Sequence, residues 1–204
     1  MNKNFATYDL ENELKSLGYG CIAGVDEAGR GCGAGPVVAA ACVVPDEVVS
    51  ELLFKVKDSK KLTAKKREEL FPIIRSKCSV GVGVVNSKVI DDINILNATK
   101  LAMEEALSNL WDFDYAIIDG TVVLKDVPFP QAQVIKGDAK SISIAAASII
   151  AKVTRDRIML DLDDIWPEYG FAVHKGYLTK EHIQAIKDYG PCEVHRLTFN
   201  KVGK

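Results

Sequence analysis

Four acidic residues lie at positions in this chain where carboxylate chemistry could be built. Asp26 and Glu27 are adjacent and come at the end of a short apolar run. Asp119 directly follows a second apolar run, and Asp138 comes just after a third. Taken one at a time, each of these acids is more often a turn residue or a surface charge. Taken together, acids at the ends of successive strands in one sheet can converge on a point.

Such a cluster predicts a divalent cation. Carboxylates brought together without a counter-charge repel one another, and a cation removes that cost. Hard oxygen ligands suit Mg²⁺ or Mn²⁺, and the absence of neighbouring histidine or cysteine disfavours zinc. Asp156 is a secondary candidate, because it lies inside a helical segment beside Arg155 and Arg157 and could simply pair with one of these arginines.

Apolar periodicity predicts the elements that position these residues. Strands are expected over 21–26, 37–44, 78–85, 115–118 and 132–135. Helices are expected over 5–17, 46–56, from Thr63 onward with a disturbance at Pro72, over 97–111, 141–166 and 179–189. Adjacent residues in a strand point to opposite faces, so Asp26 and Glu27 serve one site only if their strand ends there. The pattern is that of an α/β domain with a mixed sheet flanked by helices.

Composition limits the class of protein. The chain has 204 residues, of which 48% are hydrophobic and 26% charged, with a formal net charge of −2. We expect one domain spanning 1–204, with a helical part from about residue 160. No uncharged stretch is long enough to span a membrane, and the N-terminus lacks the apolar run of a signal peptide, so a cytoplasmic protein is expected. The five cysteines form no C-x-x-C pair and are expected to be reduced.

Basic and imidazole side chains give weaker signals. The stretch 55–67 is rich in lysine, and a solvated helix face and a phosphate-contacting surface are both compatible with it. Arg196, Lys201 and Lys204 are weaker candidates for the same contact. The three histidines are too far apart in sequence to suggest a metal triad, and surface or supporting positions are expected for them.

Several ordered motifs together resemble bacterial ribonuclease HII. The most specific is GVDEAGRG at 24–31. The others, in order, are DSKKL (58–62), IDG (118–120), KGD (136–138), AAASIIAKVTRD (145–156), HKGY (174–177) and HRL (195–197). The related ribonuclease HIII usually has an extra N-terminal domain and a different pattern after its Asp-Glu, so type HII is preferred.

The resemblance implies a ribonuclease H-like fold with a small C-terminal helical extension. It also implies a metal-dependent endoribonuclease that cuts 5′ of ribonucleotides in RNA/DNA hybrids and of single ribonucleotides in duplex DNA. The products carry 5′-phosphate and 3′-hydroxyl ends, and the implied role is removal of misincorporated ribonucleotides. The expected catalytic and metal-binding residues, which would hold two Mg²⁺ or Mn²⁺ ions, are Asp26, Glu27, Asp119 and Asp138.

The same resemblance assigns residues to the substrate. In the family, the turn Gly29-Arg30-Gly31 reads the ribonucleotide, because its glycines let the backbone approach a ribose and Arg30 can hold a phosphate. Tyr177 matches the tyrosine that packs on the adjoining deoxyribose, and Lys60 is a further candidate. The expected partner is nucleic acid, with no membrane, and the protein is expected to be a monomer.

Two other interpretations of the sequence are weaker. The string 29–34 satisfies G-x-G-x-x-A, but a dinucleotide site needs a helix next, and a strand-like run follows instead. No phosphate-loop string is present. A nucleic-acid binder without catalysis is the other alternative, and the presence of all four carboxylates gives it no support.

Overall fold

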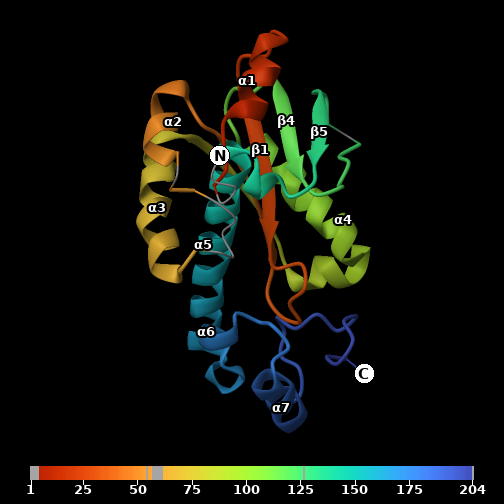
Figure 1. Cartoon of the computed structure of the whole chain (residues 1–204). Coiled ribbons are helices and arrows are strands. Elements are labelled where there is room, and N and C mark those ends of the chain that lie inside the picture. Colours follow the sequence, from red (N-terminus) through yellow and green to blue (C-terminus); the bar gives the residue numbers. More distant parts are fainter. Residues whose placement is uncertain (1–4, 54, 57–61, 126, 204) are drawn as a thin grey trace.

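A five-stranded sheet forms the centre of the computed structural model, which describes residues 5–53, 55–56, 62–125 and 127–203 (Figure 1). The strands are β1 (Ile22–Ala28), β2 (Val37–Val43), β3 (Ser79–Val85), β4 (Tyr115–Asp119) and β5 (Gln131–Val134). Their order across the sheet is β3-β2-β1-β4-β5. The β1–β2 and β2–β3 pairs are antiparallel, whereas the β1–β4 and β4–β5 pairs are parallel. The predicted mixed sheet is therefore confirmed.

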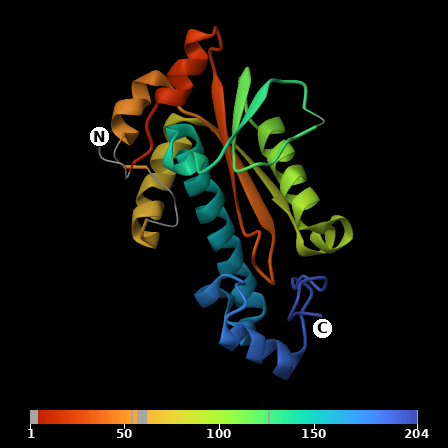
Figure 2. The same ribbon diagram turned by 45° about the vertical axis from the view of Figure 1, so that its right-hand side comes forward.

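Helices cover both faces of this sheet (Figure 2). They are α1 (Asp9–Ser16), α2 (Asp46–Leu52), α3 (Ala64–Lys77), α4 (Ser87–Ser108), α5 (Ile142–Ile165), α6 (Phe171–His174) and α7 (Lys180–Tyr189), with short 3-10 turns η2 (Gly137–Ala139) and η3 (Pro167–Tyr169). α5 packs on β1 and β2 with α2 and α3 outside it, and α4 packs on the opposite face (Figure 2).

Strand β2 shows why the layers form. It is buried on both faces, and its side chains alternate between the two hydrophobic cores. Ala40 and Cys42 point into the core beneath α5, whereas Ala39 and Ala41 point into the core beneath α4. Alternation with a period of two is the geometry of any strand, so a run of small apolar residues supplies both cores at once.

Close packing of α5 onto β1 places the helix beside the acidic end of that strand. A methyl group at Gly24 would lie 2.2 Å from the backbone nitrogen of Ile144, so only glycine permits this approach. At the same helix end, the Ser141 side chain accepts a hydrogen bond from the Ile144 backbone. Buried Glu11 of α1 accepts hydrogen bonds there from Ser141 and from the backbone of Ser143. These contacts fix where α5 begins.

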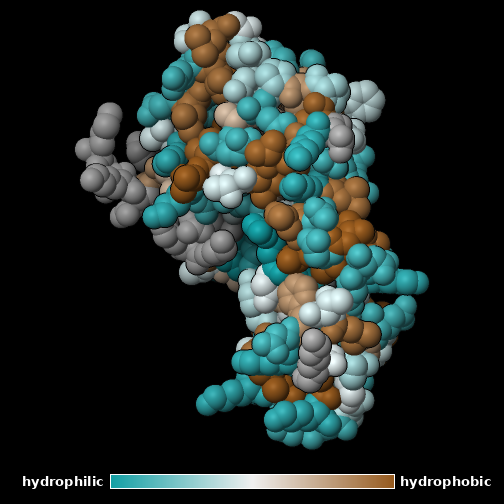
Figure 3. Space-filling view, turned by 90° about the vertical axis from the view of Figure 1, so that its right-hand side faces the viewer, coloured by the Kyte–Doolittle hydropathy of each residue, from teal (hydrophilic) through white to brown (hydrophobic). Residues whose placement is uncertain are grey.

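After α5 the chain forms η3, α6 and α7, which lie below the sheet in Figure 1. A smaller lower part and a larger upper body are visible in the space-filling view (Figure 3). Within the described ranges, no helix combines the length and the apolar character needed to cross a membrane. The assignment of 1–204 to one domain stays a prediction.

The predicted elements are all found, and their limits differ in instructive ways. The helix expected over 97–111 begins ten residues earlier, at Ser87, and is broken at Asn94, whose φ is 65°. The Asn94 side chain accepts hydrogen bonds from the backbone of Leu96 and Asn97, so it starts a second helical segment and interrupts the periodicity. The helix expected from Thr63 is α3, which includes Pro72 and continues to Lys77, with Leu70 and Ile74 buried on either side of the proline.

Candidate active site

The end of β1 carries the adjacent carboxylates. Asp26 is 5% exposed, and its side chain accepts a hydrogen bond from the Glu27 backbone at 2.7 Å. Burial raises the pKa of Asp26 well above its ordinary value, and the nearby charges of Glu27 and Asp119 raise it further, while a hydrogen bond with Ser148 of α5 opposes the shift. The strand does not end at this pair, as the one-site condition required, but continues to Ala28. The site forms because β4 ends first, leaving this stretch of β1 without a neighbour on that side.

The other two carboxylates come from β4 and from η2. The last parallel pair of β1 and β4 is Val25 with Ile118, so Asp26 and Asp119 follow at the same level of the sheet. The Asp119 side chain accepts a hydrogen bond from the backbone nitrogen of Gly137 at 2.6 Å, which brings η2 against the end of β4. Asp138, the next residue, is 9% exposed. The four acids predicted from sequence thus lie at, or next to, the same end of the parallel strands β1 and β4.

Their chemistry fits a hard divalent cation. The donors are carboxylate oxygens from Asp26, Glu27, Asp119 and Asp138, and burial together with the charges of Glu27 and Asp119 disfavours the ionised form of Asp26 and raises its pKa. A cation would reverse that effect. In the described part of the chain, no three His, Cys, Asp or Glu side chains are already arranged as a metal cage. The backbone hydrogen bonds to Asp26 and Asp119 occupy one oxygen of each.

A small hollow lies between Glu27, one of these acids, and the predicted substrate residues. Its volume is about 140 Å³, and its lining consists of Glu27, Ala28, Gly29, Arg30, Gly31, Lys152 and Tyr177. Arg30 is exposed and its Nη1 lies 3.4 Å from Glu27 Oε1. Tyr177 is 46% exposed. One carboxylate, the glycine-flanked turn and the predicted tyrosine therefore share one cavity, although the turn and the tyrosine come from distant parts of the sequence.

Two buried arginines hold the segment that contains this turn. Arg155 and Arg196 are both 0% exposed, and both bind backbone carbonyls. Arg155 donates to the carbonyl oxygens of residues 34, 36 and 175, at 2.9 to 3.1 Å. Arg196 donates to the carbonyls of Gly35 and Arg30, the second of which lies within the turn. The phosphate contact expected for Arg196 is therefore wrong for this structure, because its guanidinium is buried and already engaged.

Glycine at position 29 follows from this packing. Gly29 has a φ of 96°, and a methyl group there would lie 2.1 Å from Nε of Arg155. Both the left-handed backbone and the close arginine exclude a larger residue. The glycine that the sequence offers as a reader of the ribonucleotide is thus also required by the packing beneath the turn.

Asp156 pairs with basic side chains of α5 and α3. Its side chain accepts a hydrogen bond from Lys152 at 2.7 Å and lies 3.8 Å from Arg67 of α3. The expected pairing with Arg155 or Arg157 is wrong, because Arg155 binds carbonyls and Arg157 pairs with an acid of α3, Glu68. Asp156 instead fixes Lys152, whose Nζ lies 6.0 Å from the centre of the Tyr177 ring.

Lys152 is the residue of the hollow that sequence reasoning missed. It lies within the motif 145–156, and the available signal was its position one helical turn before Asp156. Lys60, the remaining predicted substrate residue, lies outside the described residues, as does much of the basic stretch 55–67. Arg67, at the end of that stretch, donates to the carbonyl of Leu62 and has a side chain that is only 12% exposed.

For two of the histidines, the structure excludes one of the two expected positions. His182 and His195 are 0% and 2% exposed, and their Nε2 atoms lie 3.0 Å apart. The His174 ring stacks on that of His182 with centroids 4.4 Å apart. Of the two expected positions, surface or supporting, the surface one is wrong for His182 and His195, which lie in one cluster with His174.

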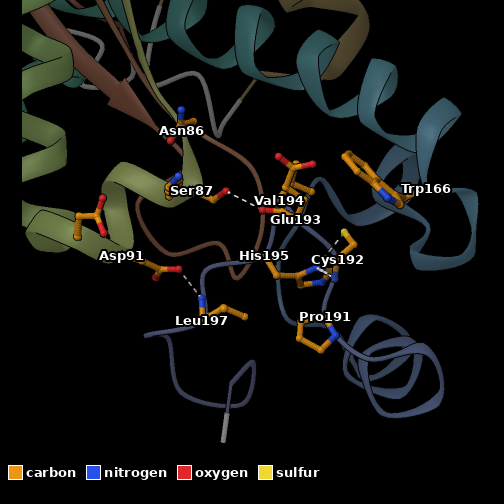
Figure 4. Close-up of a pocket in the computed structure, with 12 residues that line it drawn as sticks. Asn86, Ser87, Asp91, Trp166, Pro191, Cys192, Glu193, Val194, His195 and Leu197 are labelled. Atoms are coloured by element: carbon orange, nitrogen blue, oxygen red, sulfur yellow. Dashed lines mark hydrogen bonds between the residues drawn. The ribbon is translucent and has the colours of Figure 1, made fainter.

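A larger cavity, of about 650 Å³, lies away from the carboxylates, between the start of α4 and the C-terminal segment 191–197 (Figure 4). Hydrogen bonds anchor this segment to α4: Ser87 donates to the Glu193 carbonyl, and Asp91 accepts from the Leu197 backbone (Figure 4). The segment carries His195 and Arg196, so its attachment to α4 supports the parts of the site that these residues hold.

Comparison with known proteins gives consistent matches. The sequence profile of ribonuclease HII matches residues 23–202. The chain is 55% identical to ribonuclease HII of Acetivibrio thermocellus over 202 residues, which is 98% of this chain and 78% of that protein. The structure of ribonuclease H2 from Pyrococcus horikoshii OT3 is similar with a TM-score of 0.75 and 31% identity, over 90% of this chain and 96% of that one.

A more distant structure shares the fold alone. Bst-RNase HIII in complex with Mn²⁺ is similar with a TM-score of 0.69 and 22% identity, over 93% of this chain and 70% of that one.

Proposed function

Because this chain belongs to the ribonuclease HII family, we propose that it incises duplex DNA on the 5′ side of a single embedded ribonucleotide. Cleavage of the RNA strand of RNA/DNA hybrids is the activity of the family, and the embedded ribonucleotide is the finer substrate. The observation that supports it is the hollow in which Glu27, the turn 29–31 and Tyr177 meet. A site that recognises one ribonucleotide beside deoxyribonucleotides needs contacts both to the ribose and to the adjoining deoxyribose, next to the phosphate that reacts.

Each part of the hollow has a role in this proposal. The backbone at Gly29 and Gly31 approaches the ribose and its 2′-hydroxyl, the group that distinguishes RNA from DNA. Arg30, which is exposed, holds an adjacent phosphate. The half-exposed ring of Tyr177 packs on the deoxyribose that adjoins the ribonucleotide.

The carboxylates provide the hydrolytic part of the site. Asp26, Glu27, Asp119 and Asp138 would hold two divalent ions, Mg²⁺ or Mn²⁺, which supply charge neutralisation at the phosphate and an activated water. The chain's own contribution is to fix these oxygens: the Gly137 backbone orients Asp119, and Ser148 together with the Glu27 backbone orients Asp26. The products carry 5′-phosphate and 3′-hydroxyl ends. We further propose that the protein acts as a monomer in the cytoplasm, where it removes misincorporated ribonucleotides.

The test uses a labelled duplex with one ribonucleotide, a continuous RNA/DNA hybrid and an all-DNA duplex, each with and without Mg²⁺ or Mn²⁺. A metal-dependent nick directly 5′ of the lone ribonucleotide, absent from the all-DNA duplex, is expected. Cleavage of the hybrid alone would keep the family activity and refute the embedded-ribonucleotide substrate. Binding without cleavage of any duplex, by folded protein and with either metal, would favour a nucleic-acid binder instead.

A further inference from the structure

Three imidazoles form one connected group behind Tyr177. His174 ends α6, His182 lies in the first turn of α7, and His195 lies in the C-terminal segment. The His174 and His182 rings are stacked, with an angle of 14° between their planes. His182 and His195 meet through Nε2 atoms 3.0 Å apart. These are all the histidines of the chain, since the sequence contains three.

Hydrogen bonding fixes the tautomer of each ring. His195 Nδ1 accepts from the Cys192 backbone nitrogen at 2.9 Å, so the proton of the neutral ring is on Nε2. That proton points at His182 Nε2, which must therefore accept it. The proton of His182 is then on Nδ1, which lies 2.9 Å from the carbonyl oxygen of Tyr177 and donates to it. The three bonds form a chain with a single direction.

His174 follows the same logic on its own side of the turn. Its Nδ1 accepts from the backbone nitrogen of Gly176 at 3.1 Å, so Nε2 carries the proton. Nε2 lies 2.7 Å from the carbonyl oxygen of Tyr169 and donates to it. All six ring nitrogens of the group thus have a partner when the three rings are neutral. Burial lowers the pKa of His182 and of His195 to about 4, in agreement with neutral rings.

The group braces the turn that presents Tyr177. Lys175 and Gly176 both have left-handed backbones, with φ of 52° and 80°. Such a turn in a non-glycine residue persists only where its surroundings hold it. Here imidazoles bond to the turn itself, through the backbone nitrogen of Gly176, and to the residue after it, through the carbonyl of Tyr177.

The same group of histidines also contacts the segment that follows the turn 29–31, which is proposed to bind the ribonucleotide. His195 forms a β-bridge with Ala34, and Gly33 donates from its backbone nitrogen to the carbonyl of Gly176 at 2.9 Å. The segment after the glycine-flanked turn therefore lies between His195 and the Tyr177 turn. The turn 29–31 and Tyr177, which are proposed to contact the substrate, are therefore both supported by this group of histidines.

We propose that His182 is a positioning residue for Tyr177, because its Nδ1–H fixes the tyrosine backbone relative to the turn 29–31 and so sets selectivity for a lone ribonucleotide. This inference rests on the proposed function of Tyr177. His182 itself is buried, so in this proposal it acts through Tyr177.

Two substitutions of similar polarity distinguish the roles of the two ring nitrogens of His182. In His182→Asn the amide lies near the position of Nδ1 and can still donate to the Tyr177 carbonyl. In His182→Gln the amide lies near the position of Nε2 and faces His195, so the bond to Tyr177 is lost. Gln184→Ala, on the exposed part of the same helix, is the matched control.

The readout is a ratio of two kcat/KM values, one for the single-ribonucleotide duplex and one for the continuous hybrid. Loss of one buried hydrogen bond predicts that His182→Gln lowers this ratio by about threefold to tenfold. His182→Asn and the control are expected to stay within about twofold of the wild type, and His182→Gln with Tyr177→Ala should match Tyr177→Ala alone within about twofold. Equal losses on both substrates, or a further loss in the double variant, would overturn the positioning role.

Nitrogen NMR of the histidines gives a second test that needs no variant. The proton is expected on Nδ1 in His182 and on Nε2 in His174 and His195, and a His182 ring protonated on Nε2 instead would refute the bond to Tyr177. The two proposals fail separately. If the wild type does not cut the single-ribonucleotide duplex, the proposed function is wrong; if it does and only Tyr177→Ala loses selectivity, the role of His182 is wrong.

Discussion

Acidification should destabilise this protein through its buried imidazoles. Burial lowers the pKa of His182 and His195 to about 4, whereas both titrate near 6.5 in the unfolded chain. Between these values the unfolded chain binds protons that the folded protein does not, so the folded state loses stability as the pH falls. The contribution is fully present above pH 6.5 and is lost progressively as the pH approaches 4. Protonation of His182 would also set its Nε2–H against that of His195 across a 3.0 Å contact, and protonation of His195 would set its Nδ1–H against the backbone N–H of Cys192.

The magnitude follows from the linkage relation. Lowering the pH from 7.5 to 5 should cost about 2 kcal/mol of unfolding free energy for each of the two rings, or about 4 kcal/mol together. Removing one titrating ring, as in His182→Asn, should reduce the pH dependence by about 2 kcal/mol. Asp26, whose raised pKa acts in the opposite direction, is common to both proteins and cancels in the comparison.

Urea unfolding of the wild type and of His182→Asn at pH 7.5, 6 and 5 measures the contribution of His182 as the difference in pH dependence between the two proteins. The result to compare is the change of unfolding free energy with pH within each protein, not the absolute stability, which the substitution itself alters. NMR titration of the three histidines provides an independent check. A pKa near 6.5 for His182 and His195 in the folded protein, or identical pH dependence of the two proteins, would refute the reasoning.

Three further outcomes are expected. Asp119→Asn or Asp138→Asn should reduce cleavage by at least about 100-fold while largely sparing duplex binding, because the charge of the site is removed and its shape is kept; near-normal turnover with a labelled hybrid would contradict the site assignment. Tyr177→Ala should reduce cutting at a lone ribonucleotide more than along continuous RNA, and equal losses would remove its role at the junction. Glu11→Ala should lower the unfolding free energy by about 1–3 kcal/mol, because the Ser143 backbone loses its acceptor at the start of α5. Exposed Glu13→Ala on the same helix is the control, and equal stability of the two variants in urea would count against this account.

Much of the site could be predicted from the sequence because its signals are local. The carboxylates follow apolar runs, and β4 ends at Asp119 as its apolar run predicts, although β1 continues past Asp26 and Glu27 to Ala28. The glycines at 29 and 31 indicate a turn, and at position 29 the left-handed backbone and the close arginine exclude a larger residue. The start of α7 could also be predicted, and the Thr179 side chain accepts a hydrogen bond from the His182 backbone as an N-cap does.

Other residues could not be placed, because their partners are distant in the chain. Arginine often contacts phosphate, yet Arg196 is buried and donates to the carbonyls of residues 30 and 35. The partners of Asp156 include Arg67 from another helix, and the histidines meet only after the C-terminal segment returns to the loop that follows β1. A charged or imidazole side chain has the same local pattern whether it is exposed or buried, so only its environment decides its role.

The sequence by itself determined the family resemblance, the mixed α/β class and the four carboxylates as candidates for the site, because apolar runs, turns and acidic residues are properties of short segments. The tertiary structure alone decided that Lys152 and Tyr177 share a hollow with the turn 29–31. It also decided that buried arginines and histidines support that turn instead of facing solvent. The physical reason is that burial and hydrogen-bond partners are set by contacts between segments far apart in the chain, and no local spacing records them.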